Sequence, residues 1–208
     1  MATAIYHFTH VDNFVRILEA REMTCDRVCQ DSGLTVRNVG YSSLKNLRMQ
    51  TEVEVEPFGT LGDYVPFYFG TRSPMLYVYT KGYVTGKPED TDDLIYLVSS
   101  AEAVSSSGLP FVFTDGHPIR EPKAFFNDLA DLHNVDMPLM TERMWTDTDA
   151  DPDKKRRRQA EFLVYHRLPL ELMAGIATKS ATRRTWVKGL LGEAGWDIQC
   201  ASRPGWYY

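Results

Sequence analysis

Short apolar runs, separated by turns and by brief helical periods, decide which fold classes are open to this chain. β-branched and aromatic residues gather in segments such as YVPFYFG and LIYLVS, which is typical of strands. The predicted strands cover residues 4–8, 64–70, 94–99, 110–113, 161–166, 175–178 and 196–201. Apolar residues at helical spacing predict helices over residues 10–20, 41–49 and 137–145, one that opens at Pro122 and one that is capped by Ser180. This alternation indicates an α+β fold on an antiparallel sheet.

Four local features refine this expectation. Thr9 and Asp12 match the Ser/Thr-x-x-acid pattern that starts a helix. Pro66 lacks an N–H, so its strand is expected at a sheet edge or at a bulge. Residues 51–55 alternate and predict an edge strand. Residues 25–40 show no period, and we expect a loop that orders on a ligand.

Composition narrows the class of protein. The chain has 208 residues, 43% of them hydrophobic, which suffices for one compact domain over residues 1–208. Its formal net charge is −5, so a polyanion must be bound by a local basic patch. The three cysteines are too few and too scattered for a disulfide framework, and we expect free thiols and a cytoplasmic protein. We expect neither a signal peptide nor a membrane span.

The most concentrated charge is the run KKRRR at residues 154–158, which is followed closely by Glu161. Such a run is most often a solvated face. An acid at the first position of an apolar strand, however, lies either at the rim or in a site. Alternating aspartates precede the run and resemble an EF-hand loop, but Pro152 replaces its glycine and Arg158 its glutamate, so calcium is excluded. We expect no metal, because no ligand pattern is present.

Several fragments together carry a family resemblance. Tyr6-His7-Phe8-Thr9, then Phe67-Tyr68-Phe69, then Glu161 follow the order of the His-Tyr-Glu triad of the ADP-ribosyltransferase superfamily. The longer blocks YHFTHVDN, DYVPFYFGTRSPMLY, LPFVFTDGH and RRQAEFLVY, with the terminal WYY, resemble the DarT family of toxins that ADP-ribosylate DNA. The blocks keep their order over nearly the whole chain.

The resemblance implies an ADP-ribosyltransferase fold, a split and mostly antiparallel β-sheet flanked by helices, with NAD⁺ as co-substrate in the cleft. It implies that NAD⁺ is bound by His7, Thr9, Asn13, Tyr68, Met75 and Arg48. Catalysis is expected of Glu161, Arg48 and His117. The acceptor is expected to be thymidine in single-stranded DNA, bound by Tyr41, Lys45, Lys154, Lys155, Arg156, Arg157 and Arg158. The implied partner is a macrodomain antitoxin.

The residue types fit this chemistry. Loss of nicotinamide builds an oxocarbenium-like charge on the ribose, which a carboxylate such as Glu161 stabilises. The neighbouring cations are expected to keep Glu161 ionised. The acceptor of the thymine proton stays open between Glu161 and His117, with a mainly electrostatic role for Arg48. The alternatives are the same fold acting on guanosine, RNA or protein, and a non-catalytic nucleic-acid-binding module.

Overall fold

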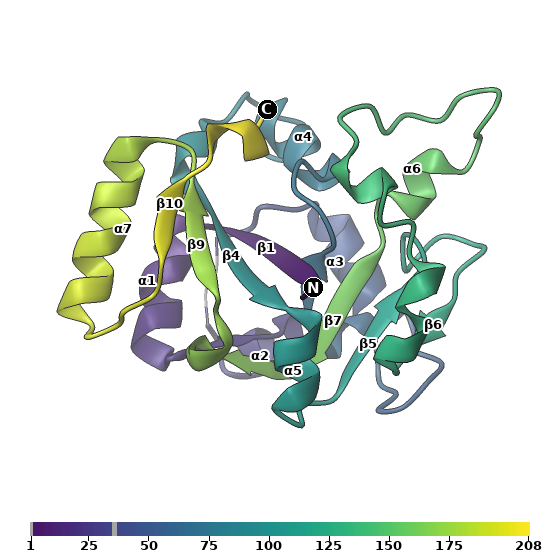
Figure 1. Cartoon of the computed structure of the whole chain (residues 1–208), viewed down its shortest axis with the longest axis horizontal. Coiled ribbons are helices and arrows are strands. Elements are labelled where there is room, and N and C mark those ends of the chain that lie inside the picture. Colours follow the sequence, from purple (N-terminus) through teal and green to yellow (C-terminus); the bar gives the residue numbers. More distant parts are fainter. Residues whose placement is uncertain (1, 35–36) are drawn as a thin grey trace.

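One large sheet organises the chain in the computed structural model, which describes residues 2–34 and 37–208. Its strand order is β10-β9-β4-β1-β3-β7-β5-β6, and every pairing is antiparallel except that of β10 with β9 (Figure 1). The strands are β1 Ala4–His10, β3 Tyr64–Tyr68, β4 Leu94–Ser100, β5 Phe111–Thr114, β6 Phe125–Phe126, β7 Glu161–Tyr165, β9 Gly175–Thr178 and β10 Cys200–Ser202. A small separate sheet pairs β2 Glu22–Thr24 with β8 Arg167–Pro169. The mostly antiparallel α+β architecture is therefore confirmed.

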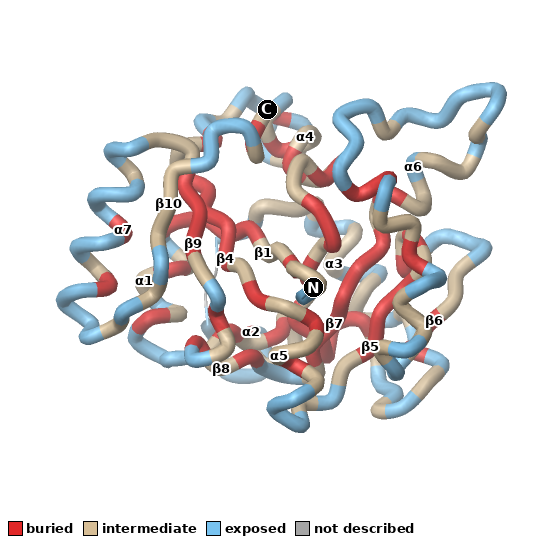
Figure 2. Tube along the Cα trace, in the orientation of Figure 1, coloured by how far each residue is buried: buried red, intermediate tan, exposed pale blue. Residues whose placement is uncertain are grey.

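Short helices surround the sheet. They are α1 Val11–Ala20, α2 Asp26–Asp31, α3 Ser42–Arg48, α4 Pro74–Thr80, α5 Ala101–Ser106, α6 Lys154–Arg157 and α7 Ala181–Glu193. The longest, α7, lies beside β10 at one side of the molecule, and α6 lies at the opposite side (Figure 1). Buried residues follow the strands, whereas the outer surfaces of the helices and the loop before α6 are exposed (Figure 2).

The sheet divides between β1 and β3. These strands share the single register pair Tyr6↔Tyr68, whereas β3 pairs with β7 along its whole length. The His7 side chain fills the gap, since its Nδ1 lies 2.8 Å from the carbonyl oxygen of Pro66. In a strand the N and O of one residue point to the same side, so the N–H that Pro66 lacks would also have faced β1. Pro66 therefore removes no bond to β7 and keeps the two halves apart.

The prediction of an edge strand at Pro66 is wrong, because β3 lies between β1 and β7. Residues 51–55 form no strand either, and contribute the isolated bridge Glu52↔Thr60. The segment over residues 25–40 contains α2, a helix that was expected to be a loop; residues 35–36 lie outside the described part. The helix start also differs, because the N-cap of α1 is His10, whose Nδ1 accepts from the N–H of Asp12.

Two further helices that the apolar spacing predicted are absent from this described part of the chain. After Pro122 come the short strand β6 and the 3₁₀ helix Leu129–Asn134, since Phe126 stacks on Phe113 in the sheet. Residues 137–145 hold a 3₁₀ turn at Leu139–Thr141. In both places contact with the sheet, rather than helical period, fixes the backbone.

Candidate active site

Glu161 is the first residue of β7, one strand away from the division between β1 and β3. It stands opposite Tyr68 on β3, which in turn stands opposite Tyr6 on β1. Residues directly opposite each other in a sheet share a face, so Glu161 and Tyr68 point to the same side. Glu161 is 5% exposed, and its backbone N–H donates to the Thr114 hydroxyl at 3.1 Å. The strand register thus presents one buried carboxylate beside one tyrosine.

Arg48, the last residue of α3, binds this carboxylate. Its Nη1 lies 2.9 Å and 3.1 Å from the two oxygens of Glu161, and both side chains are largely buried. Its Nη2 is buried without a hydrogen-bond partner. Burial opposes both charges, yet the pKa of Arg48 is raised because Glu161 outweighs desolvation. Burial raises the pKa of Glu161, and Arg48 limits that rise.

Tyr68 forms the wall beside this ion pair. Its ring is stacked on Phe8 at an interplanar angle of 13°, and its hydroxyl lies 4.0 Å from the sulfur of Met75 on α4. Burial raises the pKa of Tyr68, so its phenol stays neutral. Met75 also faces Gly40, where an added Cβ would lie 3.1 Å from the sulfur. Tyr68 and Met75 therefore offer a flat aromatic ring and a polarisable sulfur next to Glu161.

His7, Thr9 and Asn13 follow one another from β1 into α1. Burial lowers the pKa of His7, whose neutral ring donates Nδ1–H to Pro66 and leaves Nε2 as an acceptor. Asn13 donates to Thr9 at 3.1 Å and to the carbonyl of Arg37 at 2.9 Å, while its oxygen accepts the Arg37 N–H at 2.8 Å. The Asn13 amide thus holds the backbone that follows residues 35–36.

His117 belongs to the segment that supports Glu161. Its Nδ1 accepts the N–H of Ile119 at 3.2 Å, so the proton of the neutral ring lies on Nε2. Burial and the charges of Arg48 and Arg120 lower the pKa of His117 to about 4. His117 is therefore a neutral hydrogen-bond donor at neutral pH, and its Nδ1 is not free to take up a proton.

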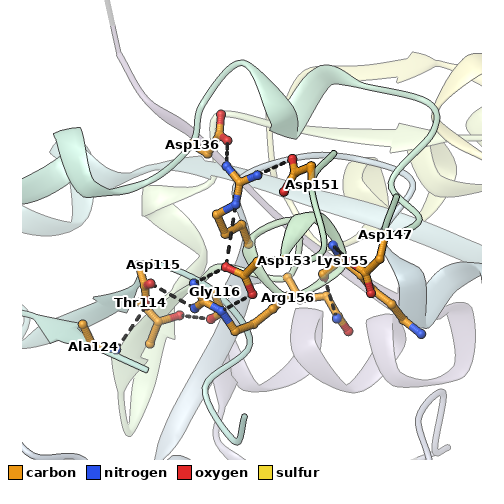
Figure 3. Close-up of polar contacts among 12 residues, drawn as sticks. Thr114, Asp115, Gly116, Ala124, Asp136, Asp147, Asp151, Asp153, Lys155 and Arg156 are labelled. Carbon is orange, nitrogen blue, oxygen red and sulfur yellow. Dashed lines mark hydrogen bonds and ion pairs between the residues drawn. The ribbon is translucent and has the colours of Figure 1, made fainter. Parts of the chain in front are cut away.

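Most of the basic run forms the short helix α6, and most of its charge is paired (Figure 3). Arg156 bonds Asp153 and Asp115, and Arg157 bonds Asp136 and Asp151. Lys154 reaches Glu142 at 2.5 Å. The aspartates that resembled a calcium loop are thus partners of these cations.

The two remaining cations of the run differ in burial, since Arg158 is buried and Lys155 is exposed. Arg158 is 1% exposed and donates to the Thr71 carbonyl, so its guanidinium is enclosed by the protein in this structure. Lys155 is exposed, and its backbone N–H donates to Asp147 at 2.7 Å. The expectation that this run keeps Glu161 ionised is corrected, because the cation that opposes the burial of Glu161 is Arg48.

Tyr41 and Lys45 lie on the same helix as Arg48. Tyr41 is the half-buried N-cap residue of α3, and Lys45 forms an ion pair with Asp26 at 2.7 Å. Lys45 therefore already has an anionic partner within the protein.

Sequence reasoning missed Thr114 and Asp115, although both belong to the block LPFVFTDGH that carries the family resemblance. Thr114 accepts from Glu161 and donates to the Gly116 carbonyl at 2.7 Å, while Asp115 bonds Arg156 at 2.9 Å. Their signal was their position between the end of the predicted strand over residues 110–113 and His117.

Two absences concern the described residues, 2–34 and 37–208. Within them, no three His, Cys, Asp or Glu side chains are grouped in a way that could hold a metal ion. Nor does any helix there have the length and apolarity that crossing a membrane requires.

Solved structures share this architecture over the whole chain. The chain superposes on Thermus sp. 2.9 DarT in complex with ADP-ribosylated ssDNA with a TM-score of 0.92 and 35% identity, covering 100% of this chain and 97% of that one. For the same protein in complex with NAD⁺ the TM-score is 0.87, with 34% identity and coverage of 100% and 98%. Thermosipho africanus DarTG, at 18% identity and a TM-score of 0.79, shares the fold.

Curated sequences agree. A DNA ADP-ribosyl transferase of Thermus sp. (strain 2.9) is 37% identical over 209 residues, covering 99% of this chain and 96% of the relative. One from Mycobacterium tuberculosis is 33% identical, covering 98% and 88%. Fold and sequence together define an ADP-ribosyltransferase that uses NAD⁺ and acts on DNA. The chain belongs to the DarT family, described as "ssDNA thymidine ADP-ribosyltransferase, DarT", which matches residues 6–208. The family resemblance of the sequence fragments is thereby confirmed.

Proposed function

We propose that this chain transfers ADP-ribose from NAD⁺ to thymidine in single-stranded DNA, with Glu161 as its catalytic carboxylate. The observation that carries the assignment is the buried Glu161, placed opposite Tyr68 by strand register and bonded to Arg48. An unpaired Nη2 of Arg48 beside this pair is an open donor. A non-catalytic binding module would leave this costly buried pair without a purpose.

The NAD⁺ site follows from the same side chains. Tyr68 provides a face for nicotinamide, and Met75 borders it. His7 Nε2 is an acceptor for a ribose hydroxyl, because Nδ1 is already bonded. Thr9 and Asn13 lie farther along the same wall and are assigned to the phosphate and adenosine side. Arg48 Nη2 is assigned to the substrate, either to the diphosphate or to the acceptor base.

The reaction breaks the bond between ribose C1′ and the nicotinamide nitrogen, whose electron pair leaves with nicotinamide. A ring nitrogen of thymine then bonds C1′ and gives up its proton. Glu161 stabilises the oxocarbenium-like charge, an effect worth about 3–4 kcal/mol for one well-placed group. Glu161 is also the proton acceptor that we favour, since its carboxylate, bonded to Arg48, is the acceptor group next to Tyr68. His117 Nδ1 is occupied, and the pKa of Arg48 is raised.

DNA contacts are assigned to side chains of α6 and α3 and of the N-cap of α3. Lys155 is exposed and carries the strongest assignment, and Tyr41, Lys45 and Lys154 are half-buried candidates. Arg156 and Arg157 are already paired with carboxylates, so their contribution to phosphate binding is weak. Restriction to single strands follows because the reacting edge of thymine is paired in a duplex.

Defined oligonucleotides test the assignment. The protein is incubated with NAD⁺ labelled on the adenine half and with single-stranded DNA that lacks one base at a time, beside duplex DNA, RNA and protein. We expect label on every single strand that contains thymine and none on thymine-free DNA. Label that depends on guanine would instead identify guanosine as the acceptor, and label on RNA or protein alone would contradict a DNA substrate.

The partner is proposed to be a macrodomain antitoxin that binds this toxin and removes the modification. The support is membership in the DarT family, together with the fold shared with DarTG of Thermosipho africanus. Incubation of the labelled DNA with a purified macrodomain antitoxin should release free ADP-ribose. Retention of the label, with no complex between the two proteins by size-exclusion chromatography, would argue against this partner.

A further inference from the structure

Arg156 is largely buried and bonded to two carboxylates, whereas an arginine that binds DNA phosphate is expected to be accessible. Its Nε and Nη2 each donate to one oxygen of Asp153 at 2.8 Å, and its Nη1 donates to Asp115 at 2.9 Å. Its side chain is 10% exposed. Two carboxylates against one guanidinium leave the local charge negative, which repels a phosphate. Figure 3 shows the Arg156 guanidinium directed at the segment that contains Asp115 and Gly116, away from solvent-facing Lys155.

The backbone repeats the contact that the side chain makes. The N–H of His117 donates to the carbonyl of Arg156 at 2.9 Å. Gly116 packs so closely that an added Cβ would lie 2.2 Å from Arg156 Nη1 and 3.0 Å from its carbonyl oxygen. Asp115 uses its second oxygen to accept the N–H of Ala124 at 3.1 Å. Arg156 is thus fixed to the segment over residues 114–117 by its side chain at Asp115 and by its backbone carbonyl at His117.

The segment over residues 114–117 also holds the backbone of Glu161 by a hydrogen bond. Thr114 Oγ1 accepts the Glu161 N–H at 3.1 Å and donates to the carbonyl of Gly116 at 2.7 Å. The carboxylate assigned to the reaction and the imidazole of His117 are therefore both attached to one short stretch of backbone. That stretch ends a strand and has no regular structure beyond Thr114, so contacts from outside must hold it.

We propose that Arg156 is a positioning residue, which, held between Asp153 and Asp115, fixes residues 114–117 so that His117 Nε2–H meets the thymine base above Glu161. The role rests on the proposed function, because it concerns the acceptor side of that same site. Asp115 and Asp153 act with Arg156 as one unit. The basic run that the sequence associates with DNA phosphate would then serve the DNA reaction through the placement of His117.

A double-mutant cycle tests whether Arg156 acts through His117. Arg156→Gln, His117→Ala and the double variant are compared in single-turnover transfer to a thymine oligonucleotide at saturating NAD⁺ and DNA. We expect Arg156→Gln to slow transfer about 10–100-fold, as misplacement of a catalytic group does. The double variant should be no more than about 2-fold slower than His117→Ala alone, because coupled residues are not additive. Asp115→Asn should behave like Arg156→Gln, and Arg156→Lys should recover part of the rate.

Arg183→Gln is the matched control, because Arg183 also lies between two aspartates, Asp92 and Asp93, on a different helix. Whatever its own effect, that effect should multiply with the effect of His117→Ala. Multiplicative losses for Arg156→Gln would overturn the proposal, as would a raised KM for DNA with unchanged kcat. Thermal melting of each variant identifies any that fail to fold, and Asp115→Asn then takes the place of Arg156→Gln.

A second readout needs no transfer and separates this proposal from the proposed function. His117 is titrated by NMR in the wild-type protein, in Arg156→Gln and in Arg183→Gln. Release of the segment should move the pKa of His117 up toward the ordinary value of about 6.5 in Arg156→Gln alone. An unchanged titration would contradict positioning of His117 by Arg156, whether or not the wild-type protein modifies DNA.

Discussion

Arg48 and Arg156 are both largely buried arginines bonded to carboxylates, yet they differ in how many of their nitrogens have a hydrogen-bond partner. Arg48 meets one carboxylate through one nitrogen and keeps a buried Nη2 without a partner. Arg156 distributes three nitrogens over two aspartates. Hydrogen-bonding capacity left open in a buried group is costly unless a ligand completes it, whereas a saturated group is structural. Both arginines carry the same charge. What distinguishes Arg48, in the reacting region, from Arg156, outside it, is that Arg48 has a hydrogen-bond donor left for a ligand.

The largest loss of activity is expected from a change in the ion pair between Arg48 and Glu161, in which Arg48 keeps an unpaired Nη2. Glu161→Gln should slow transfer by at least about 100-fold, because a neutral amide cannot stabilise the developing ribose charge. It keeps an oxygen for Arg48, so circular dichroism should show a native fold with a lowered Tm. NAD⁺ affinity, measured by calorimetry, should change far less than rate. Transfer that stays near the wild-type rate would remove Glu161 from the mechanism and leave the two arginines equivalent.

A smaller effect concerns the stability of the basic run. Arg158→Ala should lower the free energy of unfolding by about 2–4 kcal/mol, because it empties a buried position and leaves the Thr71 carbonyl without its donor. Lys155→Ala, at an exposed neighbour, should change it by less than about 0.5 kcal/mol. Urea unfolding measures both. Equal losses of unfolding free energy would mean that the buried Arg158 and the exposed Lys155 contribute alike to stability.

A further effect on stability depends on pH. The pKa of His117 is about 4 in the folded chain and about 6.5 when unfolded, so the unfolded state binds the proton first. Its contribution to stability is complete above pH 6.5 and is lost as the pH falls toward 4. His117→Gln should flatten the unfolding free energy between these values relative to wild type. Identical pH profiles in urea unfolding would place His117 in solvent.

Local pattern predicted the strands well, because β-branched and aromatic runs such as residues 94–99 leave few other packings. It failed after Pro122, where helical spacing of Phe125 and Phe126 yielded to their packing in the sheet. The triad of His7, Tyr68 and Glu161 was predicted through family resemblance, and strand register brings Tyr68 and Glu161 together. The ion pairing of the basic run could not be predicted from the sequence, because Arg156 pairs with Asp115, a residue far from it in the chain.

The division at Pro66 has a consequence for the way the molecule holds together. Within the large sheet, one ladder pair, Tyr6↔Tyr68, and one side-chain bond from His7 join strands β10-β9-β4-β1 to strands β3-β7-β5-β6. The two halves are also tied outside the ladder, because Arg72, after β3, donates to the Tyr96 hydroxyl on β4 and to the Tyr207 carbonyl. The separate pairing of β2 with β8 and a hydrophobic core shared by both halves add to this connection. Side chains and packing thus do along the division what ladder hydrogen bonds do elsewhere in the sheet.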